Sequence, residues 1–353
     1  MALAAGSLAP PSLLSQGFVH LSTPAQVALP ANALYAGRDD LVLLVIDPAR
    51  LPGELRWEPG RPEDPADMQF PHHYAPLPVA SVVAVVPYRP GADGRYAAPV
   101  GLPAAGDLNG RVRVFDRSLA ERRAAAVVSV DGGVAVLDPR FPASHEHNTL
   151  WVQGRADAAA VAAEAERVLG GAGLRLRRAV LDDPGTAGAL ADLGWAVDEQ
   201  RLMVFAGEPP QRSSAVVAVA HEVVARMWRR SWARDMPGID DETVRQLVAR
   251  EPLADAVMRI VDLAVLGAAG DPMASTQLRL DGATAAVEAV MTDPEHRRGG
   301  LGSALVLDAV ARAQEAGADV VFLSAAADDW PREWYARIGF TDIGPRFEAS
   351  LTP

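Results

Sequence analysis

The chain has 353 residues, of which 49% are hydrophobic and 22% charged, a composition typical of globular proteins. It contains no cysteine, which excludes disulfides, thiolate-bound zinc and a cysteine nucleophile, and all 33 basic residues are arginine. The net charge of −12 argues against a nucleic-acid partner, because phosphate binding needs a basic face. With no apolar run of the roughly 18 residues that a membrane helix needs, and no basic signal-peptide start, we expect a cytoplasmic protein without a membrane partner.

Short runs rich in Val and Leu, separated by turns, fill the first hundred residues and predict strands. Five polar residues fall at the ends of these strands or in the turns: His20, Arg56, Glu58, His72 and Tyr74. Such a set can bind an anionic small molecule, or its histidines can simply be structural.

Three stretches in this region, GFVHLS from Gly17, LRWE from Leu55 and FPHHYAPL from Phe70, resemble the domain of unknown function 952 family, with Ala75 replacing a glycine. The resemblance implies a small α+β domain over residues 1–105, with a fold like that of ADP-ribosyltransferases and a nucleotide-like ligand such as NAD. The family opens with a strand before its first helix, whereas Met1 falls within the expected helix ALAAG. We therefore expect about twenty further residues upstream, enough for a strand and a helical turn or two.

Two stretches dense in Gly, Pro and small polar residues, Arg89–Gly110 and Gly207–Ser214, predict linkers. These linkers delimit two segments, 109–206 and 212–353, and both contain the order helix, strand, helix, strand. They end alike, in LGWAVDEQRLMVF and IGFTDIGPRFEAS. This indicates a duplicated α/β unit, although any two α/β units share such an order.

In the second segment the strand TAAVEAVM leads into TDPEHRRGGLGSAL and then a helix. Glycines at such a turn predict an anion site, because the first helical amides are free and the helix dipole adds positive charge. Arg297 and Arg298 can add charge-assisted contacts. The absence of lysine excludes a P-loop of the Walker type, and the glycine spacing does not fit a dinucleotide-binding loop. The matching place in the first segment, VQGRAD, has the single glycine Gly154. A plain turn that caps the helix is the alternative.

The pattern R-x-x-G-x-G, from Arg297 to Gly302, resembles the acetyl-CoA pyrophosphate loop of the GCN5-related N-acetyltransferase (GNAT) family. The resemblance implies an α/β fold class: tandem GNAT folds, each with a mixed sheet flanked by helices, of which the first is degenerate. It also implies acetyl-CoA as the cosubstrate and no metal. The cofactor-binding residues would be Val290, Met291, Thr292, Arg297, Arg298, Gly299, Gly300, Leu301, Gly302, Ser303, Ser324 and Asp328.

The same resemblance assigns two catalytic roles. Tyr335, in the helix before the Gly339–Phe340 pair, matches the family tyrosine that protonates the departing thiolate, although it can also be a core tyrosine. Glu288 interrupts an apolar strand, where a carboxylate needs a partner or a task, and can deprotonate the amine. A glutamate on the solvent face of the strand is the alternative. Because the chain has no cysteine, we expect direct attack in a ternary complex.

The acceptor implied is a small-molecule or peptide amine, and the sequence leaves its identity and the oligomeric state open. A protein that senses CoA without turnover, and an NAD-linked N-terminal module, are alternative functions. Two histidines in SHEHN, from Ser144, could bind a metal but more simply form a loop. The spacing of the tryptophans in RMWRRSWARDMPG, from Arg226, predicts an amphipathic helix, from which Trp232 or Arg234 could contact the acceptor.

Overall fold

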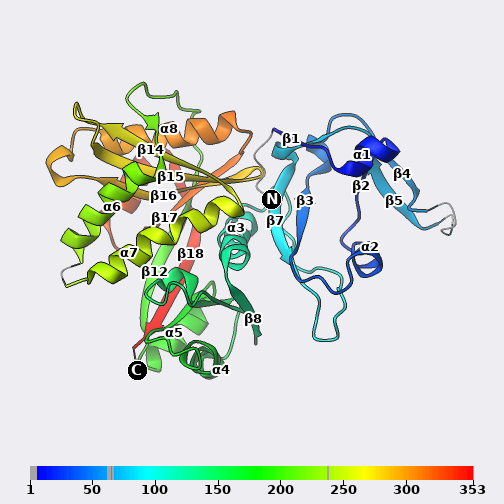
Figure 1. Cartoon of the computed structure of the whole chain (residues 1–353), viewed down its shortest axis with the longest axis horizontal. Helices are drawn as coiled ribbons and strands as arrows, with labels where there is room; N and C mark the ends of the chain where they lie inside the picture. Colours follow the sequence, from blue (N-terminus) through cyan, green and yellow to red (C-terminus); the bar gives the residue numbers. More distant parts are fainter. Residues whose placement is uncertain (1–5, 62–64, 66, 237, 353) are drawn as a thin grey trace.

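The computed structural model describes residues 6–61, 65, 67–236 and 238–352. Figure 1 shows a smaller N-terminal part, in blue and cyan, beside a larger part that contains the rest of the chain. No helix among the described residues is long and apolar enough to cross a bilayer.

In the described residues the N-terminal part has short strands, as the short Val- and Leu-rich runs predict, and two short α-helices. The strands are β1 (Ser7–Leu8), β2 (Val19–His20), β3 (Leu41–Ile46), β4 (Leu55–Pro59), β5 (Gln69–His73), β6 (Leu77–Pro78) and β7 (Val82–Tyr88), and the helices are α1 (Pro11–Gln16) and α2 (Ala28–Leu34). They form three small sheets, ordered β1-β6, β2-β5-β4 and β3-β7. The helix expected at ALAAG lies outside the described residues except for Gly6, so the upstream extension stays a prediction.

The rest of the chain contains two units with the predicted alternation of helices and strands. The first comprises α3 (Leu108–Arg123), β8 (Ala126–Val130), β9 (Gly133–Leu137), β10 (Thr149–Val152), α4 (Ala158–Ala165), β11 (Arg177–Leu181), α5 (Pro184–Asp192) and β12 (Ala196–Phe205). The second comprises β13 (Val217–Ala218), α6 (His221–Asp235), α7 (Asp241–Ala249), β14 (Arg259–Leu266), β15 (Pro272–Asp281), β16 (Thr284–Thr292), α8 (Leu301–Glu315), β17 (Val320–Ala326), α9 (Trp330–Arg337) and β18 (Phe340–Leu351).

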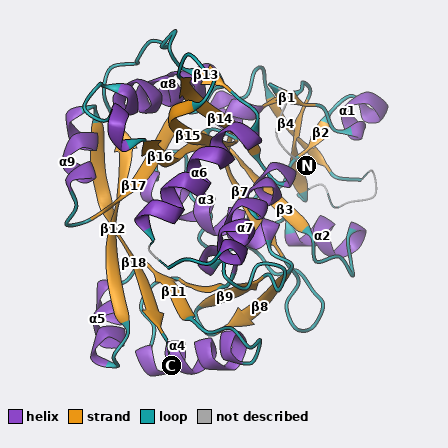
Figure 2. Cartoon of the chain, turned by 60° about the vertical axis from the view of Figure 1, so that its left-hand side comes forward, coloured by secondary structure: helices purple, strands orange, loops and turns teal. Residues whose placement is uncertain are grey.

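These strands form one mixed sheet in which the two units exchange their last strands. The order is β13-β14-β15-β16-β17-β12-β18-β11-β10-β9-β8, so that β12 pairs with β17 and β18 pairs with β11. In Figure 2 the long strands β12 and β18 lie side by side at the junction of the units. The loop between residues 206 and 212 therefore separates two chain segments, while the sheet and its core continue across it.

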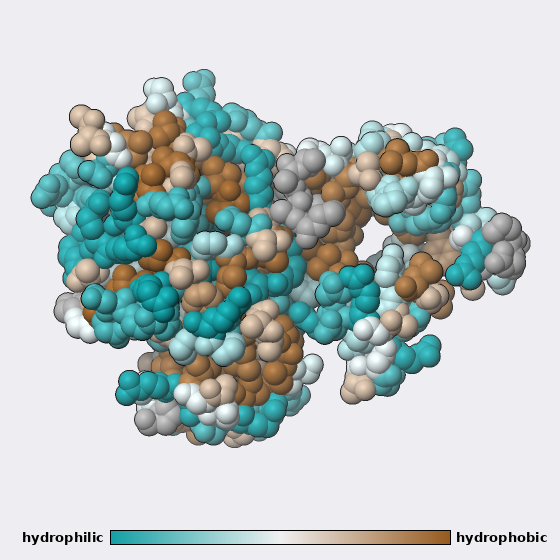
Figure 3. Space-filling model, in the orientation of Figure 1, coloured by the Kyte–Doolittle hydropathy of each residue, from teal (hydrophilic) through white to brown (hydrophobic). Residues whose placement is uncertain are grey.

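The N-terminal part is joined to the turn between β15 and β16. The Ala283 N–H donates a 2.7 Å hydrogen bond to the Val82 carbonyl, and Thr284 Oγ1 donates a 3.1 Å bond to the next carbonyl of β7. Arg111, which is fully buried, pairs with Asp319 at 2.7 Å. In Figure 3 apolar residues gather over β3 and β7, on the side that faces the large sheet.

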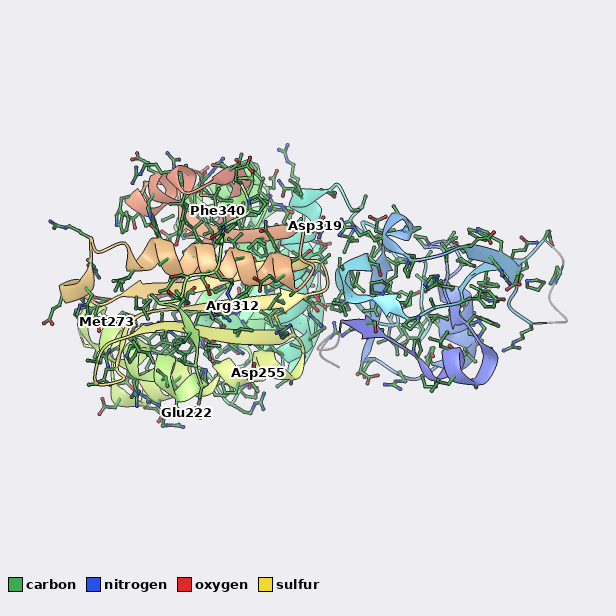
Figure 4. The ribbon with its side chains drawn as sticks, turned by 90° about the horizontal axis from the view of Figure 1, so that it is seen from above. Glu222, Asp255, Met273, Arg312, Asp319 and Phe340 are labelled. Carbon is green, nitrogen blue, oxygen red and sulfur yellow. The ribbon has the colours of Figure 1, made fainter. Side chains whose placement is uncertain are left out.

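This junction lies at the opposite end of the sheet from the glycine-rich loop. Figure 4 shows Asp319 next to the N-terminal part and Met273 at the far end. The Met273 carbonyl accepts a hydrogen bond from the Asp293 N–H, just after β16 ends. The N-terminal part is thus docked away from the loop that carries the predicted anion site.

Candidate active site

The candidate cofactor site opens where two parallel strands diverge. Thr284–Ala286 of β16 pair with Val320–Phe322 of β17. The two strands do not pair beyond this, although β16 continues to Thr292 and β17 to Ala326. Beyond this ladder lies a cavity of about 840 Å³, lined by the end of β16, the following loop, the start of α8 and one face of α9. The backbone groups of β16 that face the gap have no partner on β17 there and can bind an extended ligand.

A β-bulge turns the end of β16. Its register with β15 shifts here, Ala289 has a φ of 51°, and Thr276 Oγ1 donates a 2.8 Å hydrogen bond to the Glu288 carbonyl. Among the described residues, Ala289 and Arg298 are the only ones other than glycine with a positive φ. Such backbone strain persists where the surrounding structure holds it, and it clusters at binding and catalytic sites.

The glycine-rich loop presents free amides to this cavity. Gly300, with a φ of 79°, is the N-cap of α8, and the first helical hydrogen bond runs 3.0 Å from the Ala304 N–H to the Gly300 carbonyl. The amides of the first three helical residues therefore have no acceptor within the helix. A Cβ on Gly302 would lie 3.3 Å from the Trp334 ring, so a side chain there would require the indole to shift by a few tenths of an ångström. The arrangement suits a phosphate.

Basic side chains surround these amides. The cavity is lined by five of them, Arg234, His296, Arg297, Arg298 and Arg337, and by one carboxylate, Asp235. The Arg297 Nε–H donates to the Thr292 carbonyl at 3.2 Å, which holds the loop against the end of β16. Positive charge and free amides together favour a polyanionic group.

Most of the predicted cofactor residues meet in this cavity. Its lining includes Val290, Met291, Thr292, Arg297, Arg298, Gly300, Leu301, Gly302 and Ser303. Gly299, Ser324 and Asp328 do not line it: Ser324 lies in β17 opposite Leu202, and Asp328 is exposed before α9. Ser303 also positions the wall, because its hydroxyl accepts a 3.1 Å hydrogen bond from Trp334 Nε1.

His296, Trp330, Trp334 and Arg337 also line the cavity and were not predicted to bind cofactor. Trp330, Trp334 and Arg337 are spaced four and three residues apart, which places them on one face of α9. That spacing was visible in the sequence and would have pointed to them.

Tyr335 also lines the cofactor cavity, from the middle of α9. Its side chain is buried, with its ring centroid 4.6 Å from that of Trp334. Burial, and next the nearby charge of Glu288, raise the pKa of the Tyr335 hydroxyl above its ordinary value of 10. The phenol therefore keeps its proton at neutral pH and can act as an acid.

A second cavity, of about 320 Å³, adjoins the first at Met291, which lines both. Glu288 and Ala289 of the bulge border it, as do Arg279, Trp228 and Trp232 of the second unit and several residues of the first. It thus lies between the two units and shares Met291, near the end of β16, with the cofactor cavity. Trp232, predicted as an acceptor contact, lies here, and Arg234 lies in the cofactor cavity.

Glu288 has a carboxyl group without a hydrogen bond or ion pair in the described part of the chain. Burial raises its pKa from the ordinary 4.5 to about 7, against the opposing effect of Arg279. A carboxyl group that titrates near neutral pH is suited to accept a proton from an amine.

The first unit differs from the second at the corresponding place, where a cavity of about 440 Å³ is lined by residues 155–158 and the start of α5. β10 and β11 remain paired up to the last residue of both strands. The Gly154 N–H donates to Asp182 Oδ1 at 2.7 Å, and the Ala156 N–H donates to Thr186 Oγ1 at 3.0 Å. Side chains of the unit itself therefore bind amides of the loop before α4, and in the first turn of that helix the Ala159 N–H donates a 3.0 Å hydrogen bond to Asp157 Oδ1.

The N-terminal candidate residues form a cluster on β2, β4 and β5. His72 Nδ1 lies 3.0 Å from Glu58 Oε2, and the Tyr74 hydroxyl donates to the same oxygen at 2.7 Å. The Arg56 guanidinium lies 4.5 Å from the Tyr74 ring centroid, and the His20 and His72 rings are 4.9 Å apart. These five side chains border neither of the two cavities. The SHEHN stretch forms a short 3₁₀ turn, and the described residues bring no group of three metal-binding side chains together.

Two family models match the chain. "Protein of unknown function (DUF952)" matches residues 1–85, and "Acetyltransferase (GNAT) family" matches residues 226–340. No curated protein matches it. A Caulobacter crescentus protein of known structure is 33% identical over 27% of this chain and 82% of its own, with a TM-score of 0.24.

Solved structures also resemble a large share of the chain. A conserved protein of unknown function from Staphylococcus epidermidis has a TM-score of 0.51 at 15% identity and covers 64% of this chain and 94% of its own. A GCN5-related N-acetyltransferase from Kribbella flavida has a TM-score of 0.47 at 20% identity and covers 65% and 91%. At 15% identity the likeness to the Staphylococcus epidermidis protein concerns the fold alone. The family models bear out both resemblances: the chain has an N-terminal segment of the DUF952 family and, at residues 226–340, an acyltransferase domain of the GNAT acetyltransferase family.

Proposed function

We propose that the chain is an acetyl-CoA-dependent N-acetyltransferase that transfers the acetyl group directly to an amine in a ternary complex. The observation that carries this proposal is the meeting of two cavities at Met291, one with the phosphate-binding loop and Tyr335, the other with Glu288. Each cavity holds one reactant, and the end of β16 lies between them.

The chemistry assigns one proton transfer to each side. Acetyl-CoA supplies the thioester, with its pyrophosphate at the amides and arginines around Gly300. Glu288, as the carboxylate, takes a proton from the acceptor amine, whose nitrogen forms a bond to the acetyl carbon while the carbon–sulfur bond breaks. Tyr335 donates its proton to the departing sulfur. Unpaired amides of β16 can polarise the thioester carbonyl.

The continuous pairing of β10 with β11 and the bound loop amides of the first unit support a single acetyl-CoA site. The loop amides of the first unit are bound by Asp182 and Thr186, so we assign acetyl-CoA to the second unit alone. The domain ranges 1–105, 109–206 and 212–353 remain our proposal for the segments, with the first unit contributing to the acceptor cavity.

Calorimetric titration of acetyl-CoA into the full chain tests the proposal. We expect binding to wild type and at least a hundredfold weaker binding to a Gly300→Glu/Gly302→Glu double variant, because two carboxylates would repel the pyrophosphate. Gly188→Glu, on α5 with open space around its Cβ, is the control and should bind normally. Absence of binding to wild type would refute the proposal.

A further inference from the structure

The acceptor cavity contains a buried arginine that the protein itself leaves incompletely paired. Arg123, the last residue of α3, is 9% exposed and lines this cavity. Its Nε–H has no hydrogen-bond partner among the described residues, and its one ion pair, to Glu146, spans 3.5 Å. Burying a cation without close partners costs free energy that an anionic ligand can offset.

Arg111 and Arg122 of the same helix have close partners. Arg111 bonds to Asp319 at 2.7 Å and to the Ala283 carbonyl at 2.8 Å. Arg122 pairs with Asp281 and donates to a backbone carbonyl at 2.8 Å. Incomplete pairing is therefore not general along α3, and at Arg123 it coincides with the cavity.

The balance of charges in the cavity lining favours a ligand with one negative charge. The cavity is lined by five arginines and five carboxylates, so its charges balance when all are ionised. When Glu288 takes a proton from the acceptor, the lining carries one excess positive charge. A carboxylate on the acceptor matches this excess, whereas a doubly charged phosphate would exceed it.

The cavity also limits the size and nature of the rest of the ligand. Its volume of about 320 Å³ lies at the small end of the range for ligand pockets. Three tryptophans, Trp151, Trp228 and Trp232, form part of its wall, with the last two ring centroids 6.0 Å apart. Indole rings pack against an apolar or aromatic side chain of a ligand, and their faces attract a protonated amine.

We infer that the acceptor is a small amino acid-like amine, whose carboxylate is bound by Arg123 of the first unit while its amine faces Glu288 of the second. The inference rests on the proposed function, because it names the acceptor class of the same site. It also gives the degenerate unit a role: α3 supplies the group that selects the acceptor.

The test compares amino acids with the amines that lack only their carboxylate. CoA release by the full chain is measured with phenylalanine and phenethylamine, tryptophan and tryptamine, and leucine and isoamylamine. We expect kcat/KM for at least one acid to exceed that of its amine roughly tenfold or more, as an ionic hydrogen-bonded contact predicts. In Arg123→Gln this preference should disappear because the KM for the acid rises. The kcat/KM for the amine should stay within about twofold of the wild-type value. Arg123→Lys should restore part of it.

Arg117→Gln is the matched control, because Arg117 lies on the same helix, pairs with Glu121 at 2.8 Å and does not line the acceptor cavity. It should keep the wild-type preference. Calorimetry of the same pairs on the CoA-saturated wild type gives a readout that needs neither turnover nor a folded variant. Three results would overturn the inference. The wild type could prefer the amines, or Arg123→Gln could lower kcat/KM equally for both members of a pair. The wild type could also bind acetyl-CoA but none of the acids. Failure of acetyl-CoA itself to bind would instead refute the proposed function.

Discussion

Gly302 and Trp334 are neighbours in the wall of the cofactor cavity: a Cβ on Gly302 would lie 3.3 Å from the indole, whose Nε1–H donates a 3.1 Å hydrogen bond to Ser303 Oγ. Gly302→Ala should therefore shift the indole, which lines the same cavity, by a few tenths of an ångström. We expect several-fold weaker acetyl-CoA binding, by calorimetry, with a stability change below about 1 kcal/mol because alanine favours the helix. Gly188→Ala, with open space around its Cβ, should bind normally. Unchanged affinity in Gly302→Ala would show that the indole does not border bound acetyl-CoA.

Tyr335→Phe removes the proposed acid and keeps the ring packing. Because burial keeps the phenol protonated and general acids contribute about 10²–10⁴-fold, we expect kcat to fall by about 10²-fold or more, with the acetyl-CoA Kd within about twofold. Rapid measurement of CoA release checks this. Tyr96→Phe, a buried tyrosine whose hydroxyl donates to the Arg38 carbonyl, is the control. Wild-type kcat in Tyr335→Phe would remove Tyr335 from the mechanism, and binding without turnover in the wild type would favour the CoA-sensing alternative.

The loop and its helix were predictable from sequence because their signals are local. Glycines between a strand and an amphipathic run set the turn, and Glu288 was conspicuous as a charge within an apolar strand. The strand exchange was not predictable, because β12 and β18 have the same pattern whichever neighbours they pair with.

The acceptor cavity was equally hidden. Arg123 and Arg279 lie far apart in the chain and belong to no motif, and only the packing of α3 against the sheet brings them to one cavity. The burial of Arg111 was also not predictable from the sequence. An arginine in a helix is ordinarily expected at the surface, yet this one is buried against Thr284 and Asp319.

Gly282 holds the N-terminal part against the sheet. A Cβ there would lie 2.2 Å from the Val82 carbonyl oxygen, and its φ is 67°. Gly282→Ala should therefore loosen the docking and make the linker from residue 89 to 107 more sensitive to protease. Gly270→Ala, with a φ of 82° but open space, carries the same backbone strain without the clash. Equal protease sensitivity of the two variants would contradict this prediction.

The N-terminal cluster offers a test of the nucleotide-binding alternative. His20 and His72 lie with their rings 4.9 Å apart, and His72 is bonded to Glu58. If the cluster binds NAD, His20→Ala and His72→Ala should each weaken NAD binding at least tenfold by calorimetry, while acetyl-CoA binding stays at the wild-type value. His145→Ala, in the larger part, is the control. Failure of the wild type to bind NAD would end this proposal.

Glu288 links activity to pH. With its pKa raised to about 7, the carboxylate that acts as base is lost as the pH falls below 7, so kcat/KM should drop about tenfold per unit there. The Tyr335 hydroxyl titrates above its ordinary value, so activity should persist on the alkaline side. Glu288→Gln should lower kcat/KM by about 10²-fold and abolish the acid limb. Glu333→Gln, an exposed glutamate of α9, should keep the wild-type profile.

The same carboxyl group should link stability to pH in the opposite direction. Between its ordinary pKa of 4.5 and the folded value of about 7, the folded chain binds more protons than the unfolded chain. Its contribution to stability therefore falls as the pH rises through this window. Glu288→Gln removes the cost of ionising this buried carboxyl group. We expect its free energy of unfolding to exceed that of the wild type at pH 8 by on the order of 1–3 kcal/mol, and to be nearly equal at pH 4. Denaturant unfolding at both pH values measures this without any substrate. A stability difference independent of pH would mean that Glu288 titrates normally and is not poised as the base.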